Sequence, residues 1–304
     1  MTSAPPSAAP DASRVPLFRD APVTLGRIIN YRVVWAALAM IVGIDSISIA
    51  FSKGNDLGIL RVVLPGVLCA AGAAFALWQL WLVAVAARRT MRQGSNHRFA
   101  LLSIAGAALA AAAIAGILYD KAVPQLMEMW DIQDGDEKMG DLRIAIADEG
   151  RTLILDGAVG IDAATQVKLA LDAHPEIRTV AMGGPGGRVG PAYQIYQLIA
   201  TRRLETRTEG ACFSACTIMF LGGVRRSLAP FSYLGFHRLK FPGMDEAELG
   251  EANRQLRDFM TFRTGISAAF VSKVMDTPPE SIWIPSFKEL LEAGVIHGSD
   301  ARRN

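Results

Sequence analysis

Three long apolar segments near the N-terminus constrain this chain more than any other feature. From Val33 to Phe51 the only charged residue is Asp45, and the segments Val62 to Ala87 and Phe99 to Tyr119 contain none. An α-helix needs about 20 apolar residues to cross the hydrocarbon core of a bilayer. Each segment is long enough, so the sequence predicts three transmembrane helices within residues 33–120 and a lipid bilayer as a partner.

The basic residues beside these segments predict their orientation. Four arginines precede the first segment and four lie between the second and third, whereas the loop between the first and second carries only Lys53 and Arg61. The positive-inside rule then places the N-terminus in the cytoplasm and the C-terminal half outside, as in an integral protein of a bacterial inner membrane. Asp45, in the middle of a span, predicts either a polar contact with another helix or subunit, or a shifted or re-entrant first segment.

The rest of the chain divides by composition. Residues 1–32, rich in Pro, Ala and Ser toward their start, predict a disordered cytoplasmic tail. Residues 121–140 are acidic and irregular, which is typical of a linker or a short amphipathic connector. Residues 141–304 have the size of one ordinary domain. The formal net charge is only +2, so nothing indicates a nucleic-acid partner.

Short apolar runs alternate with helical patterns in this last domain. Residues 143–147, 152–155 and 179–182 are predicted strands, and residues 163–173 and 191–201 are predicted helices. Strands separated by helices pair in parallel through right-handed crossovers. The expected fold is therefore α/β with a largely parallel sheet.

A glycine-rich loop follows the strand at residues 179–182. It reads Gly-Gly-Pro-Gly-Gly from Gly183 to Gly187 and precedes a helix. Glycines let backbone N–H groups approach a ligand closely, and the N-terminus of a helix favours an anion or oxyanion. The spacing fits neither the dinucleotide-binding nor the P-loop pattern, so no phosphate or cofactor site is predicted. A plain structural turn is the alternative.

A serine and a histidine follow this loop in the sequence. Ser214 precedes the apolar run of residues 215–221, which predicts a buried helix. A serine in this position is usually an N-cap, but it can act as a nucleophile if a base activates it. His237 ends a strand-like run and is the histidine best placed to be that base. Its alternative is a hydrogen-bonded structural histidine.

The order of these motifs resembles the Clp-type serine peptidases of the ClpP/crotonase superfamily. The resemblance covers most of residues 141–298 and includes Leu155-Asp156-Gly157, the glycine-rich loop, Ser214-Ala215 and His237. It implies a ClpP/crotonase-like fold and self-association into a homo-oligomer. It also implies Ser214 as nucleophile, His237 as general base, and the N–H groups of Gly187 and Ala215 as the oxyanion hole.

The same resemblance implies an acid that orients the histidine. Asp276 occupies roughly the expected position, although the stretch from it to Gly294 is longer than the family's pattern. Glu280 could replace it, or the site could be a serine-histidine dyad. Asp276 could equally be a residue that ends or caps a helix.

Two cysteines flank the serine, Cys212 and Cys216. Cysteines four residues apart can approach disulfide distance, and an extracytoplasmic domain lies in an oxidising compartment. The alternatives are a disulfide that braces the turn and two buried thiols. No further Cys or His lies close enough in the sequence to suggest a zinc site, so no metal is predicted.

These observations predict a membrane-anchored serine peptidase-like hydrolase. The chain has no P-loop, and ATP is absent outside the cytoplasm, so we expect ATP-independent cleavage of unfolded or membrane-associated polypeptides. The alternative is a catalytically inactive binding or assembly module with the same fold, because fold alone does not decide function.

Overall fold

The computed structural model describes residues 23–52, 60–93, 97–133 and 139–299. The chain forms two compact units. The first contains most of three long helices, and the second contains the sheet and the remaining helices. Within α1, side chains are described only for residues 31–47. The tail at residues 1–22 and part of the predicted linker, residues 134–138, lie outside the described residues.

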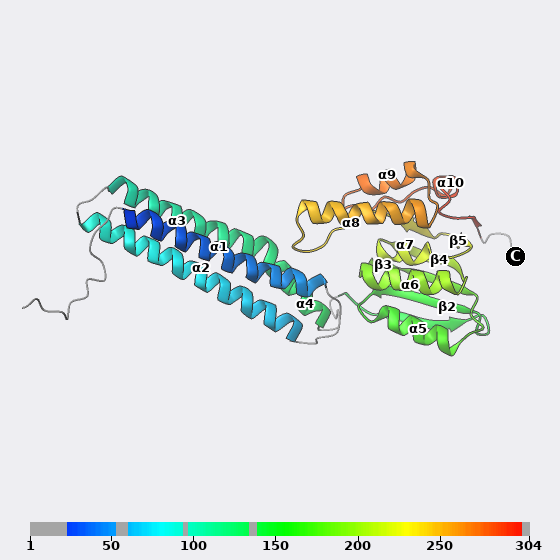
Figure 1. Cartoon of the computed structure of the whole chain (residues 1–304). Helices are drawn as coiled ribbons and strands as arrows, with labels where there is room; N and C mark the ends of the chain where they lie inside the picture. The colour runs from blue at the N-terminus through cyan, green and yellow to red at the C-terminus, as the bar shows by residue number, and fades with distance from the viewer. Residues whose placement is uncertain (1–22, 53–59, 94–96, 134–138, 300–304) are drawn as a thin grey trace, which may run out of the picture. The chain divides into compact units, whose positions relative to one another are not determined.

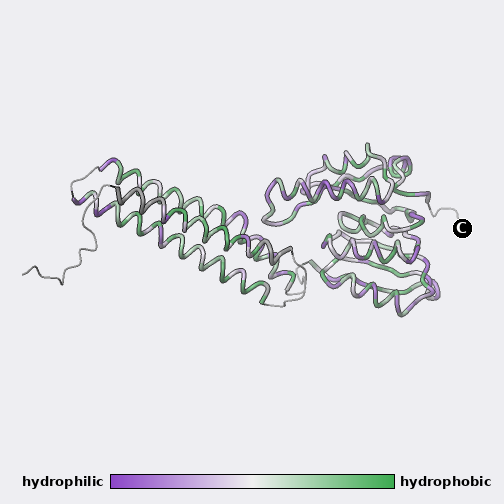
Figure 2. The backbone as a smooth tube through the Cα atoms, in the orientation of Figure 1, coloured by the Kyte–Doolittle hydropathy of each residue, from purple (hydrophilic) through white to green (hydrophobic). Residues whose placement is uncertain are grey.

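The first unit is helical where the sequence is apolar. Its helices are α1 (Val23–Ser52), α2 (Leu60–Arg92) and α3 (His97–Ile117). Figure 2 shows that apolar residues predominate along them. Arg32 Nη1 of α1 donates a hydrogen bond to Gln79 Oε1 of α2 at 2.8 Å, which gives each polar side chain a partner among apolar neighbours.

Two helical segments are long and apolar enough to cross a membrane, Val62–Arg92 and His97–Ile132, counting only the described residues. They contain the second and third predicted spans. The first predicted span, Val33 to Phe51, falls within α1, but the side chains at its end lie outside the described residues. The helix α1 also begins earlier than the apolar run, at Val23.

The stretch before the sheet is largely helical rather than an irregular linker. A π-helical turn η1 (Leu118–Ala122) leads into α4 (Val123–Gln133), so the predicted connector is helical over much of its length. The strands are β1 (Leu142–Ala147), β2 (Thr152–Val159), β3 (Thr179–Gly187), β4 (Glu205–Phe213), β5 (Arg226–Leu228), β6 (Tyr233–Gly235) and β7 (Gly298–Ser299). The helices after α4 are α5 (Ala163–Ala173), α6 (Val189–Thr201), α7 (Ala215–Phe220), α8 (Glu246–Asp258), the π-helical turn η2 (Phe259–Arg263), α9 (Ala268–Asp276) and α10 (Phe287–Glu292).

The sheet has the order β1-β2-β3-β4-β5-β7. Strand β6 also pairs with β4, at the carboxyl end of β4, after the part of β4 that pairs with β5. Among the described strands, β1 and β2 pair antiparallel and the other pairs are parallel. This confirms the mixed α/β class and the mostly parallel sheet predicted from the alternation of strands and helices. Helices α5, α6 and α7 pack side by side in this order (Figure 1).

The core lies between the sheet and these helices. Leu155 and Met182, from neighbouring strands, and Ile195 and Phe220, from α6 and α7, have no exposed surface. Burying a side chain of this size stabilises the fold by about 1.5–3 kcal/mol. The carboxyl ends of β3 and β4 are thereby held beside each other, which is where ligands bind in open parallel sheets.

Candidate active site

Ser214 occupies a strained turn between strand β4 and helix α7. Its backbone angles are φ 52° and ψ −123°, a conformation that residues other than glycine rarely adopt. Hydrogen bonds hold the turn in place. The Ser214 N–H donates to the carbonyl oxygen of Gly235 at 3.0 Å, and the Thr217 hydroxyl donates to the carbonyl oxygen of Ser214 at 2.7 Å.

The side chain of Ser214 is not used as a helix cap. Ser214 stands at the N-cap position of α7, but its hydroxyl makes no capping hydrogen bond. Ser214 is partly exposed, whereas Ala215 is only 2% exposed. The hydroxyl group therefore projects from the start of a buried helix, whose N–H groups favour developing negative charge.

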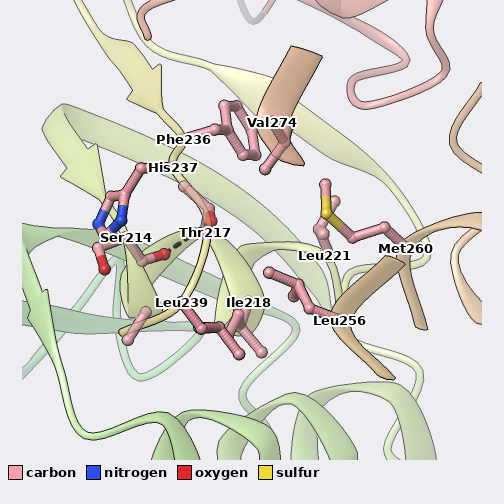
Figure 3. Close-up of a pocket in the computed structure, with 11 residues that line it drawn as sticks. Ser214, Thr217, Ile218, Leu221, Phe236, His237, Leu239, Leu256, Met260 and Val274 are labelled. Carbon is pink, nitrogen blue, oxygen red and sulfur yellow. Dashed lines mark hydrogen bonds between the residues drawn. The ribbon is translucent and has the colours of Figure 1, made fainter. Parts of the chain in front are cut away.

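His237 reaches the same place from strand β6. Phe213 pairs with Gly235 in the register of β4 and β6, so Ser214 directly follows one paired strand end and His237 lies two residues after the other. Figure 3 shows the imidazole ring beside Ser214, and both residues line one cavity. Between these two described side chains the structure has no hydrogen bond. Catalytic hydrogen bonds in ligand-free sites are often long and tighten when substrate binds.

The partner of His237 Nδ1 determines which ring nitrogen carries the proton. Nδ1 lies 2.7 Å from the carbonyl oxygen of Arg238. A carbonyl oxygen can only accept a hydrogen bond, so Nδ1 must donate. In the neutral ring Nε2 then holds the free electron pair, which is the state a general base needs.

The glycine-rich loop at the end of β3 lies against Ser214. A Cβ atom on Gly186 would stand 2.8 Å from Ser214 Cβ and 2.9 Å from the Ala215 nitrogen, and φ at Gly186 is +103°. A side chain at Gly186 would therefore separate the loop from the serine. The next residue, Gly187, pairs with Val159 of β2.

The ladder bonds around Gly187 indicate the direction of its N–H group. The N–H group of Arg188 donates to the carbonyl oxygen of Val159 at 2.7 Å. Consecutive N–H groups of a strand point to opposite edges. This alternation directs the Gly187 N–H toward the β4 side of the loop, where Ser214 lies.

Neither carboxyl group considered from the sequence hydrogen-bonds His237 in the described structure. Asp276 is the last residue of α9 and is exposed. Its neighbour Thr277 accepts a hydrogen bond from the Arg238 N–H at 3.0 Å, so the end of α9 lies near the histidine strand. Glu280 accepts a hydrogen bond from Lys240 at 2.7 Å, and this contact lowers the pKa of Glu280.

The cavity beside Ser214 and His237 is apolar and small. Its volume is about 20 Å³, which holds roughly one water molecule. A group larger than a water molecule can enter only if side chains of the lining move. Figure 3 labels these apolar residues of the lining: Ile218, Leu221, Phe236, Leu239, Leu256, Met260 and Val274.

A disulfide joins Cys212 to Cys216 across the serine turn. The two Cα atoms are 5.4 Å apart, and both residues are fully buried. The bridge ties the end of β4 to the first turn of α7. Among the described residues, no three His, Cys, Asp or Glu side chains gather in a way that could hold a metal ion.

Sequence reasoning missed the Arg238 carbonyl as the partner of Nδ1. A backbone carbonyl leaves no residue-type signal in a sequence. It also missed the hydroxyl of Thr217, which fixes the carbonyl oxygen of Ser214. That contact had a local signal, because a threonine three residues after a turn residue commonly bonds back to the backbone.

Comparison with known proteins gives structural neighbours only. The sequence matches no protein-family model and no curated protein. Among solved structures, the chain is similar to ClpP1 from Listeria monocytogenes, with 19% identity and a TM-score of 0.43 over 50% of this chain and 91% of that one. An asparagine-to-aspartate mutant of the same protein matches with 21% identity and a TM-score of 0.43, over 51% of this chain and 94% of that one.

Proposed function

We propose that this chain is a membrane-anchored serine peptidase that hydrolyses polypeptides without ATP. One observation carries the proposal. The backbone of Ser214 is strained, and its hydroxyl, unused as a cap, lies beside an imidazole whose Nδ1 is already hydrogen-bonded. Strain of about 1–3 kcal/mol at a non-glycine residue persists where the surrounding structure enforces it, and such residues cluster at active sites.

The proposed chemistry is acyl transfer. The Ser214 hydroxyl attacks the peptide carbonyl while His237 Nε2 accepts its proton, and the same proton then goes to the leaving amine. The N–H groups of Gly187 and Ala215 would stabilise the negative oxygen of the tetrahedral intermediate. Each such donor contributes on the order of 3 kcal/mol. Water then hydrolyses the acyl-enzyme by the same steps.

In this proposal the Arg238 carbonyl, rather than a carboxylate, orients the imidazole. The carbonyl accepts the Nδ1 proton, which keeps the basic electron pair on Nε2. It carries no full charge, so it stabilises the imidazolium less than an aspartate would. The site would therefore work as a Ser214–His237 dyad. Asp276 would join it only if the carboxyl group moved onto Nδ1.

The substrates we propose are unfolded or membrane-associated chains. The apolar lining of the cavity suits an apolar side chain next to the scissile bond, once the lining opens. The disulfide beside the serine supports an oxidising, extracytoplasmic compartment. The apolar helices and the arginine distribution support a cytoplasmic N-terminus and a membrane anchor. We also propose that the domain self-associates.

Labelling with a fluorophosphonate probe tests the proposal on the full-length protein in detergent. We expect wild type to be labelled and both Ser214→Ala and His237→Ala to lose labelling. Ser281→Ala and His174→Ala are matched controls, because both residues lie away from the cavity, and they should label like wild type.

The same variants then test the substrate class. Wild type should cleave an unfolded reporter polypeptide and spare its folded form, and Ser214→Ala should cleave neither. If folded wild type is not labelled with the disulfide either oxidised or reduced, the peptidase proposal fails. A non-catalytic binding or assembly module would then account for the fold.

A further inference from the structure

A salt bridge connects helix α4 to the loop that carries the proposed oxyanion donor. Glu128 of α4 pairs with the guanidinium group of Arg188, the residue that directly follows Gly187 and precedes α6. Their side chains are only 19% and 13% exposed. The chain therefore brings an acidic residue from before the domain against the edge of the candidate site.

The same stretch of chain also contacts the segment that follows His237. Gln125 is 2% exposed and donates to the carbonyl oxygen of Gly243 at 3.1 Å. A Cβ atom on Gly243 would stand 2.6 Å from the carbonyl oxygen of Lys121. The close approach of the two segments thus requires glycine at this position.

Two ion pairs strengthen the contact between this stretch and the segment that follows His237. The Lys121 ammonium lies 3.5 Å from Asp245 and 3.4 Å from Glu248, the two residues of the capping box that begins α8. The stretch from Lys121 to Glu128 therefore touches both the loop of the proposed oxyanion donor and the loop after the proposed base.

Of these contacts, the salt bridge between Glu128 and Arg188 has the most direct effect on Gly187, the proposed oxyanion donor. Burial lowers the pKa of the Arg188 guanidinium, because desolvation disfavours its charge. Burying this charge is costly unless an opposite charge lies beside it, so loss of the Glu128 carboxylate would disfavour the present position of the Arg188 side chain. Movement of Arg188 would displace Gly187, to which it is bonded.

We infer that Glu128 is a positioning residue for the oxyanion loop. By holding the Arg188 side chain it fixes the backbone directly after Gly187, and so restrains the position of Gly187 and the direction of its N–H group, which lies in the preceding peptide. The inference rests on the proposed function. Helix α4, which follows α3 through the π-helical turn η1, would then help to position the catalytic residues as well as connect the domain to the apolar helices.

The test uses the full-length protein in detergent and measures fluorophosphonate labelling at several probe concentrations. This separates the maximal labelling rate from the probe's apparent affinity. Glu128→Gln should lower the maximal rate about 10- to 100-fold, the range expected for a misplacement of up to 1 Å. The apparent affinity should stay within about threefold, because the probe's remaining contacts are intact. Glu128→Asp should restore part of the rate.

A matched control lies at the other end of α6. Arg202 follows that helix and pairs with Asp172, so Asp172→Asn removes an acid from an equivalent arginine far from the loop. It should label within about twofold of wild type. The double variant Glu128→Leu, Arg188→Met removes both charges of this salt bridge, and it should fold yet label slowly.

Three outcomes overturn the inference. Glu128→Gln could label at the wild-type rate, or the folded double variant could do so. Either result would show that the salt bridge between Glu128 and Arg188 does not position the oxyanion loop. In both cases the proposed function survives, because wild type is still labelled. Absence of labelling in folded wild type would instead overturn the proposed function, and this inference with it.

Discussion

Gly186→Ala tests the close approach between the glycine-rich loop and the serine. The new Cβ atom would stand 2.7 Å from the Phe213 carbonyl oxygen, 2.8 Å from Ser214 Cβ and 2.9 Å from the Ala215 nitrogen. Ordinary contact begins at 3.4 Å, so the loop would have to retreat by roughly 0.7 Å. The backbone at Gly186, with φ +103°, would add strain of about 1–3 kcal/mol.

This shift of the loop should lower the labelling rate more than it lowers the stability of the domain. A misplacement near 1 Å costs up to 10²-fold, so we expect fluorophosphonate labelling about 10- to 100-fold slower than wild type. This corresponds to about 1.4–2.7 kcal/mol of transition-state stabilisation. Thermal unfolding of each preparation, followed by circular dichroism, separates lost reactivity from lost folding.

Gly190→Ala is the matched control from the same motif. Gly190 lies in the first turn of α6, and a Cβ atom there would have no atom within 4 Å. Alanine in a helix is favoured over glycine by up to about 1 kcal/mol, so this variant should be as stable as wild type or more stable, with an unchanged labelling rate. Folded Gly186→Ala protein that labels like wild type would refute the proposed oxyanion loop.

Three further results follow from other contacts. His297 Nδ1 accepts a hydrogen bond from the Arg226 N–H at 3.1 Å, and its pKa is lowered, chiefly by desolvation and then by the charges of Arg226 and Arg225. The unfolded state therefore binds the proton more tightly, so this contribution to stability is present above the unfolded pKa of about 6.5 and is lost as the pH falls through the folded pKa. The melting temperature should fall between pH 8 and pH 5, and less so in His297→Asn; equal falls would contradict this. Arg226→Met should cost about 3 kcal/mol in urea unfolding, because the buried guanidinium donates to the carbonyl oxygens of Val295 and Gly294 at 2.7 Å each, and an unchanged midpoint would count against it. Asp276→Asn should label within about twofold of wild type, since Nδ1 is bonded to Arg238, whereas a loss approaching 10⁴-fold would show that Asp276 serves as a triad acid.

The sequence by itself determined the helical character of the apolar runs and the mixed α/β class of the C-terminal part. Long runs without charge at residues 62–87 and 99–119 are helical because a helix satisfies its backbone groups internally in an apolar setting. Alternation of short apolar runs with helical patterns predicted the parallel sheet, because periodicity is a local property. The serine at the start of an apolar helix was likewise visible as a local pattern, and so was the histidine after a short strand, although that strand ends two residues earlier than predicted.

Only the tertiary structure decided how these pieces meet. The Arg238 carbonyl is the partner of His237 Nδ1, and any residue type would provide that carbonyl. The contact between Glu128 and Arg188 joins residues distant in the chain, and the sequence showed Glu128 only as one acid in an irregular connector. The close approach of Gly186 to Ser214 was not visible in the sequence either, because it depends on the register of β3 against β4. Distances between remote segments are set by packing of the whole domain, and local residue patterns do not encode them.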